Sequence, residues 1–323
     1  MYDGGYGVGD GREDMSRLIN ANDNSSIGVG IQYRLGAFGF LAGHEVYRNG
    51  VVNAGLLGQQ AALQWIQRSI HRFGGDPTRV TIWGISAGDG SVMLQSFACG
   101  GTQGTSLFTN SISSSPYLPH QYDYADWIPS QAYYAFAAHA GCFTPRAYGN
   151  SARTIFQCLV SKETIVLQEA CALVSASGKY GSWAFSPVID GTFLHSTPSE
   201  ALSAGKLNGR NHLTSDAAEE GFSFVPQNIS TEEDLHGWIK LVFPLFTADD
   251  AARLRSNHPT SNCSSGLKYA TSSSSASTAL DTSVIASGLQ QIANLIYSES
   301  TFICPKYWLA EACTTRCDGG YKF

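Results

Sequence analysis

The segment from Gly55 to Gly88 constrains the fold more than any other part of the chain. From Gly55 to Arg72 the apolar residues keep a period of 3.6, which predicts an amphipathic helix ended by the glycines, aspartate and proline of 74–77. The apolar run 80–83 then predicts a buried strand, and the Ile- and Val-rich run 26–33 predicts an earlier one. Strand, helix and strand at this spacing predict a parallel βαβ unit, and the fold class is therefore α/β.

Ser86 lies between two glycines at 84 and 88, directly after the predicted strand 80–83. In a strand-to-helix turn, such a serine is raised above the sheet, and the next backbone N–H points at a developing oxyanion. The alternative is a tight turn that uses the glycines for packing and the serine as a helix N-cap. With 34 glycines in the chain a chance match is easy, so the local pattern leaves both interpretations open.

Composition excludes some classes of function. The chain has 323 residues, 43% of them hydrophobic and 14% charged, and we expect one large domain over 1–323. A net charge of −6 gives no basic surface for phosphates, so a nucleic-acid partner is not expected. No apolar run is long enough to span a membrane, and the N-terminus carries no export signal.

The cysteines point to an oxidising compartment. Their even number favours disulfides, and their spacing matches no common metal-binding pattern. Sequons at Asn24, Asn228 and Asn262 are consistent with a secreted glycoprotein. The eight cysteines are at positions 99, 142, 158, 171, 263, 304, 313 and 317.

Further elements are expected along the rest of the chain. Thr197–Glu200 forms a capping box with proline at the first helical position, and Gly205 ends the helix that it opens. The other expected elements are a strand at 108–115, helices at 131–140, from 230 and at 284–297, and a low-complexity surface loop at 271–283.

Several motifs together resemble the type-B carboxylesterase and cholinesterase-like family. They are "IQYRLGAFGFL", "NAGLLGQQAALQWIQRSIHRFGGDPTRVTIWGISAG" and "SPVIDGTFLHSTPSEALSAGKLN…EEGFSF", in the family's order and spacing over nearly the whole chain, while "SPYLPHQYDY" favours its fungal members. The resemblance implies an α/β-hydrolase fold, with a mostly parallel central sheet flanked by helices. It also implies hydrolysis of carboxylic esters of small molecules or lipids through an acyl-enzyme, with no cofactor or metal.

The resemblance assigns roles to particular residues. Ser86 matches the nucleophile, and Glu220 matches the acid of the triad, with Glu219 as the alternative in register. A surface carboxylate is the other interpretation of Glu220. The N–H groups of Gly4, Gly5 and Ala87 match the oxyanion hole. The family also implies a disulfide between cysteines 142 and 158.

Other positions depart from the family pattern. Tyr2 stands in place of a histidine and Asp3 in place of a glycine, which puts a carboxylate near the expected oxyanion. Ile85 and Gly58 replace acidic residues, and Arg34 is expected to lack a buried ionic partner. These departures support a rival interpretation, a binding or adhesion module that has lost catalysis, whereas the retained Ser86 and Glu220 argue against it.

The catalytic histidine of the family has no match. Only His236 and His258 follow Glu220, and both are expected to be solvated surface residues. In the family the histidine follows a strand that begins here at 319–323. We therefore expect the chain to be cut inside the domain at both ends, as a fragment or truncated gene product of a secreted parent, and to be inactive by itself.

Overall fold

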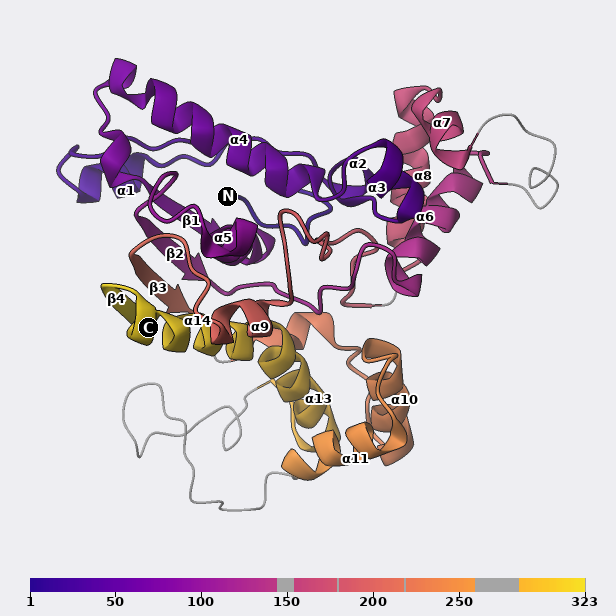
Figure 1. The fold of residues 1–323 in the computed structure, drawn as a ribbon. Helices are drawn as coiled ribbons and strands as arrows, with labels where there is room; N and C mark the ends of the chain where they lie inside the picture. Colours follow the sequence, from indigo (N-terminus) through magenta and orange to yellow (C-terminus); the bar gives the residue numbers. More distant parts are fainter. Residues whose placement is uncertain (144–153, 179, 218, 259–284, 323) are drawn as a thin grey trace. The chain divides into compact units, whose positions relative to one another are not determined.

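The computed structural model describes residues 1–143, 154–178, 180–217, 219–258 and 285–322 (Figure 1). The chain divides into two compact units, which are described separately. The first, called the sheet unit, comprises residues 1–178, 183–215 and 305–323. The second, called the helical unit, comprises residues 179–182 and 216–304.

The sheet unit is built on four parallel strands in the order β1-β2-β3-β4 (Figure 1). The expected strands at 80–83 and 108–115, and the one beginning at 319, are confirmed. Parallel neighbours require crossover connections, and α5 (Ala87–Phe97) follows β1 before the chain reaches β2. The strands are β1 (Thr81–Ile85), β2 (Asn110–Ser114), β3 (Asn211–Ser215) and β4 (Gly319–Lys322).

The prediction of a strand at 26–33 is wrong, because this segment is not part of the sheet. An extended segment becomes a strand only when a neighbour pairs with its N–H and C=O groups, and β1 is the edge strand of the described sheet. The segment instead passes close to the irregular N-terminal chain, where a Cβ on Gly30 would lie 2.3 Å from the Gly11 carbonyl oxygen. The Met1 ammonium group donates to the Trp83 carbonyl oxygen of β1 at 2.5 Å. The βαβ unit is therefore formed by β1, α5 and β2.

Apolar side chains of α4 (Ala54–Ser69), β1 and α5 form a core in the sheet unit. Leu63 and Ile66 from α4 pack with Ile82 from β1 and Val92 from α5, and each is less than a tenth exposed. The periodic pattern at 55–72 thus predicts α4 correctly. The remaining helices of this unit are α1 (Ser16–Ala21), α2 (Gly36–Phe40), α3 (His44–Asn49), α6 (Trp127–His139), α7 (Ile155–Val160), α8 (Thr164–Ala176), α9 (Pro198–Ser203) and α14 (Cys304–Arg316, from Pro305 onward).

The sheet has a buried and an exposed face. Trp83, Leu213 and Tyr321 lie on the same face of β1, β3 and β4, and they are 40%, 37% and 59% exposed. Apolar side chains on one face of a sheet are usually covered by a helix or by a second sheet. This row is therefore an apolar surface that the described part of the sheet unit does not cover.

The helical unit contains α10 (Glu232–Val242), α11 (Ala248–Asn257) and α13 (Gly288–Ser298). Thr231 caps α10 by accepting from the Asp234 N–H, and the Asp234 side chain accepts from the Thr231 N–H. The expected helices from 230 and at 284–297 are thus confirmed, while the expected loop at 271–283 lies outside the described residues. None of the described helices is both long and apolar enough to cross a bilayer.

Candidate active site

Ser86 forms the turn between β1 and α5, as the sequence predicts. Its backbone has φ 53° and ψ −121°, a conformation that residues with a Cβ rarely adopt. Three backbone hydrogen bonds hold it: the Ser86 N–H donates to the Ser114 carbonyl at 3.2 Å, and the Ser86 carbonyl accepts from Gly90 at 2.8 Å and Tyr117 at 3.0 Å. Ser86 is the N-cap residue of α5, but its side chain makes no capping hydrogen bond to the helix.

The glycines around Ser86 are required by close backbone packing. A Cβ on Gly84 would lie 2.3 Å from the Gly88 carbonyl oxygen, and one on Gly88 would lie 2.2 Å from the Met1 carbonyl oxygen. Either contact is too short for a real side chain. The spacing of the motif therefore serves both the sharp turn and the approach of the N-terminal segment.

The N-terminal glycine loop lies beside this turn. A Cβ on Gly88 would also lie 2.4 Å from the Tyr2 carbonyl oxygen, so Met1 and Tyr2 pack directly on the start of α5. Gly4 and Gly5 follow with φ values of 95° and 62°. Among the described residues, no hydrogen bond uses the N–H group of Gly4, Gly5 or Ala87 as donor. These three N–H groups therefore have no acceptor among the described residues, and their role as an oxyanion hole stays a prediction.

Trp183 is a residue that the sequence analysis did not identify. Its indole packs on the glycine loop, since a Cβ on Gly5 would lie 1.9 Å from the Trp183 Cε2 atom. The ring also packs edge-on against Tyr117, with ring centroids 4.9 Å apart. Gly5 and Trp183 are far apart in sequence, and no local pattern connects them. Trp183 forms an aromatic wall on the loop that follows Met1 and Tyr2.

Glu220 belongs to the helical unit and is half-buried at the start of a short 3₁₀ helix, Glu220–Phe224. Its Oε1 atom accepts a 2.7 Å hydrogen bond from the Ala217 N–H. Gly221 is required by α13, because a Cβ there would lie 2.0 Å from the Asn294 carbonyl oxygen. The approach of Glu220 to Ser86 stays a prediction.

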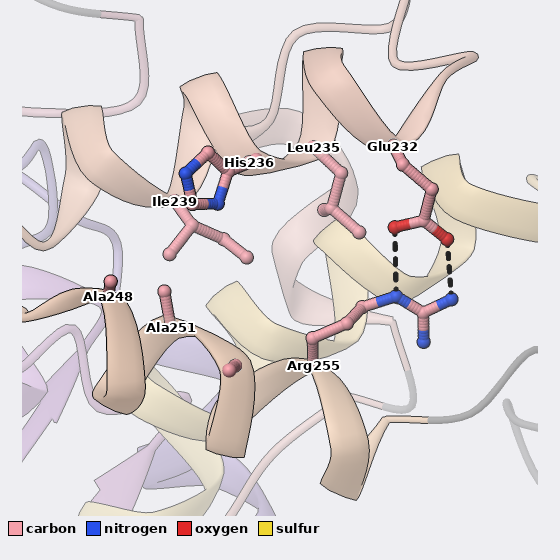
Figure 2. Close-up of a pocket in the computed structure, with 8 residues that line it drawn as sticks. Glu232, Leu235, His236, Ile239, Ala248, Ala251 and Arg255 are labelled. Atoms are coloured by element: carbon pink, nitrogen blue, oxygen red, sulfur yellow. Dashed lines mark hydrogen bonds and ion pairs between the residues drawn. The ribbon is translucent and has the colours of Figure 1, made fainter.

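His236 is exposed on α10, as expected. It lines a cavity of about 160 Å³ between α10 and α11 (Figure 2). This volume is below the range of roughly 300–1,000 Å³ that is usual for ligand pockets. Figure 2 shows the Glu232 carboxylate and the Arg255 guanidinium joined at one end of the cavity, by hydrogen bonds of 2.7 and 3.1 Å.

His258 is not the solvated surface residue that the sequence predicts. It is only 8% exposed, its Nε2 atom lies 2.9 Å from the Glu299 Oε2 atom, and its Nδ1 atom lies 2.8 Å from the Leu254 carbonyl oxygen. Burial lowers the pKa of His258, but the hydrogen bonds to Glu299 and Leu254 outweigh burial and raise it overall. Both ring nitrogens are engaged inside the helical unit, which makes His258 a structural residue.

Arg34 also differs from its expected state. The residue is exposed, and its guanidinium donates to the Ala54 carbonyl oxygen at 3.3 Å. Water therefore solvates the charge, and the cost of an unpaired buried arginine does not arise. Replacement of the family's acidic residues by Ile85 and Gly58 carries no such penalty here.

Two disulfides join cysteines in the described part of the chain. Cys142 and Cys158 are joined with a Cα–Cα distance of 5.6 Å, the pairing that the family resemblance implies. The second bond, between Cys313 and Cys317, was not anticipated. Of the sequon asparagines, Asn24 and Asn228 are exposed and the third lies outside the described residues.

This arrangement, a parallel sheet flanked by helices with a strained serine between a strand and a helix, is the α/β-hydrolase fold. Solved structures agree. EstA from Aspergillus niger has a TM-score of 0.78 and 27% identity, covering 97% of this chain and 56% of the EstA chain. PNB esterase has a TM-score of 0.71 at 22% identity, covering 98% of this chain and 59% of that one, and supports the fold alone.

The family follows from the sequence comparison. The model of the carboxylesterase family matches residues 1–320, and the chain belongs to that family. Carboxylesterase patB of Aspergillus clavatus is 37% identical over 262 residues, which are 75% of this chain and 42% of that protein. Lipase 2 of Geotrichum candidum is 34% identical over 226 residues, 67% of this chain and 39% of that protein. The chain thus spans less than half the length of these relatives.

Proposed function

We propose that the protein to which this chain belongs is a serine hydrolase of carboxylic esters, with Ser86 as its nucleophile. The backbone of Ser86 carries this proposal, because a strained, positive-φ residue is costly and such residues cluster at active sites. In the reaction the Ser86 Oγ attacks the ester carbonyl, the alcohol leaves, and water hydrolyses the acyl-enzyme.

The oxyanion formed by this attack is assigned to backbone donors. The N–H groups of Gly4, Gly5 and Ala87 lack other acceptors among the described residues, and the first two belong to the loop that packs beside the Ser86 turn. Removing one such donor costs roughly 10²–10³ in kcat in a serine hydrolase. The exposed carboxylate of Asp3 is solvated, which limits its repulsion of the oxyanion.

The remaining members of the triad are proposed as follows. Glu220 orients a histidine that takes the proton from Ser86. That histidine is assigned to sequence that the longer relatives contain and this chain does not cover, since the chain spans 42% of the Aspergillus clavatus carboxylesterase. We further assign residues 1–323 to a single domain.

The proposed substrates are esters of small molecules or lipids. Relatives named carboxylesterase and lipase support both classes, and Trp183 on the Gly5 loop gives the candidate site an apolar wall suited to an acyl chain. We also propose a secreted, glycosylated parent. Relatives named secreted lipases, from Botryotinia fuckeliana and Arthroderma benhamiae, and the two exposed sequons support this assignment.

A labelling and turnover experiment tests the proposal. The 323-residue chain and a version extended by its genomic flanks are treated with a serine-reactive fluorophosphonate and a short p-nitrophenyl ester. We expect labelling at Ser86 and turnover in the extended protein only, because loss of the histidine base costs on the order of 10⁶ in kcat. An extended protein that neither labels nor turns over any ester would favour the binding-module interpretation.

A further inference from the structure

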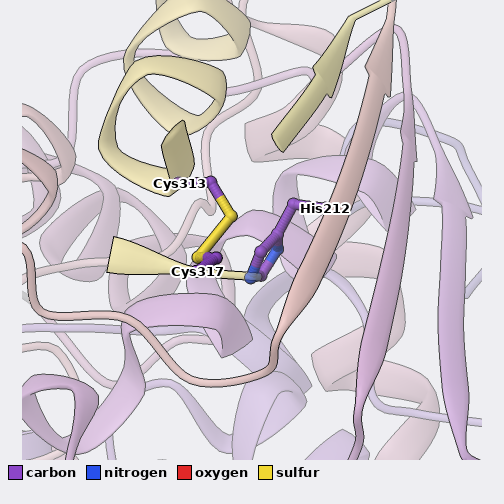
Figure 3. A group of neighbouring side chains, drawn as sticks. All are labelled: His212, Cys313 and Cys317. Carbon is purple, nitrogen blue, oxygen red and sulfur yellow. A yellow bond between two sulfur atoms is a disulfide. The ribbon is translucent and has the colours of Figure 1, made fainter. Parts of the chain in front are cut away.

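Three side chains with metal-ligating atoms meet in the sheet unit, away from Ser86. They are His212, Cys313 and Cys317, and one ligand atom from each lies within 4.8 Å of the others. Figure 3 shows the His212 ring beside the two sulfur atoms, which are joined as a disulfide. His212 comes from β3, while the cysteines come from the end of α14 and the residue after it.

The local fold explains how these residues meet. Cys313 and Cys317 are four residues apart, so their side chains leave the same side of α14. His212 pairs in register with Gly320 of β4, and a Cβ on Gly320 would lie 2.9 Å from the Cys313 Cβ atom. Glycine at 320 therefore lets the end of α14 approach the sheet closely enough for its cysteines to reach the imidazole.

His212 is fully buried, and only one of its two ring nitrogens has a hydrogen-bond partner. Its Nδ1 atom lies 2.5 Å from the Ser111 Oγ atom, whereas its Nε2 atom has no hydrogen-bond partner. A buried polar atom without a hydrogen-bond partner is costly, and a group that binds it removes this cost.

The group is separate from the candidate active site. Ile82, Ser111, His212 and Gly320 are register partners near the beginning of the four strands. Ser86 follows the other end of β1, four residues after Ile82, which is about 13 Å along a strand. His212 is therefore not a base for Ser86, and a ligand bound to it would not touch an ester there.

We propose that His212 Nε2 and the Cys313 and Cys317 thiolates bind one Zn²⁺ ion when the disulfide is reduced. Two sulfurs and one imidazole nitrogen are ligands that zinc prefers, at distances of about 2.3 Å for sulfur and 2.0–2.1 Å for nitrogen. Water occupies the fourth position. In the zinc form Nδ1–H donates to Ser111 Oγ, which fixes the tautomer that presents the Nε2 lone pair to the metal.

The same two sulfur atoms either form the disulfide or bind zinc, so the two states exclude each other. Conversion of the disulfide to the zinc form takes two steps. A phosphine reductant and water convert the disulfide to two thiols, and the phosphine becomes its oxide. Zn²⁺ then displaces one proton from each thiol and binds the neutral imidazole, so that two protons are released.

The test uses the full chain under anaerobic conditions. After phosphine treatment, zinc binding is measured against a chromophoric chelator, and Co²⁺ is added separately as a spectroscopic probe. We expect one zinc ion per chain in the reduced protein, none in the oxidised protein, and a thiolate-to-cobalt charge-transfer band. Mass-spectrometric thiol counting establishes that the pair is reduced. A pair that resists excess phosphine would overturn the proposal, because the dithiol form would then be inaccessible.

Variants identify the ligands. Cys317→Ser changes a half-buried residue at the end of α14 and should abolish the cobalt band with little effect on folding. His212→Gln should weaken zinc binding more than about tenfold, and Ser111→Ala, which removes the partner of Nδ1, by about 10–100-fold. A Cys142→Ser/Cys158→Ser variant controls for the other reduced pair and should bind zinc normally. Zinc binding unchanged in Cys317→Ser would refute the site whatever the His212 variant does.

Discussion

Ser86→Gly should give a more stable protein than Ser86→Ala. Both substitutions remove the Oγ atom, so both should abolish fluorophosphonate labelling at this position. They differ only in the Cβ atom, which is strained at φ 53° and ψ −121°. The comparison therefore isolates the backbone strain at the proposed nucleophile from its chemistry.

The magnitude follows from the backbone angles. A residue with a Cβ in such a region costs of order 1–3 kcal/mol, and glycine removes this cost. Glycine also increases the freedom of the unfolded chain, which destabilises the fold by about 0.4–1 kcal/mol. The net difference should be about 1–2 kcal/mol in favour of Ser86→Gly, since the Ser86 N–H and carbonyl keep their hydrogen bonds to Ser114, Gly90 and Tyr117 in both variants.

Urea unfolding measures this difference, and an ordinary helical position provides the control. Ala172 is exposed in the interior of α8, and Ala172→Gly should destabilise the sheet unit by about 1 kcal/mol. If Ser86→Gly is instead less stable than Ser86→Ala by a similar amount, the turn is unstrained. The structural basis for assigning Ser86 as the nucleophile would then be lost.

Three further predictions concern stability and are measured by urea unfolding. Asn53 is buried at φ 54° and forms hydrogen bonds with Asp190 and with the backbone of residue 188. Asn53→Ala should therefore lower the free energy of unfolding by about 3–5 kcal/mol, and a decrease below about 1 kcal/mol would contradict this network. The pKa of His258 is raised, so its pairing with Glu299 stabilises the fold fully below the unfolded pKa near 6.5 and less as pH rises through the folded pKa. The free energy of unfolding lost in His258→Gln should therefore shrink as pH rises. A loss that grows with pH would contradict the raised pKa. Cys142→Ser should cost about 3 kcal/mol by opening a disulfide of sequence separation 16, and no change in oxidised protein would show that the bond is absent in solution.

The sequence predicted well where short-range patterns decide the structure. The 3.6 period at 55–72 fixes α4 because one turn of a helix brings nearby residues to the same face. The capping boxes at Thr197 and Thr231 mark helix starts because each is closed by a residue three positions later. The turn at Ser86 follows from two glycines that remove clashes within and beside the turn.

Tertiary structure alone decided the features that depend on residues far apart in the chain. The run 26–33 has a strand's composition but no paired neighbour in the described sheet, and strand formation requires a partner's hydrogen bonds. His258 is in a polar segment, yet Glu299 and the fold around it make the residue buried and paired. Neither outcome is encoded within a few residues of the position concerned.

The two most informative groupings are of this second kind. Trp183 lies on Gly5, and His212 meets the cysteines at 313 and 317, because parallel strands and their crossovers bring distant segments together. Sequence determined which side chains were available and where the local elements begin and end. Packing of those elements determined which side chains meet, because burial and hydrogen bonding act between neighbours in space and not between neighbours in the chain.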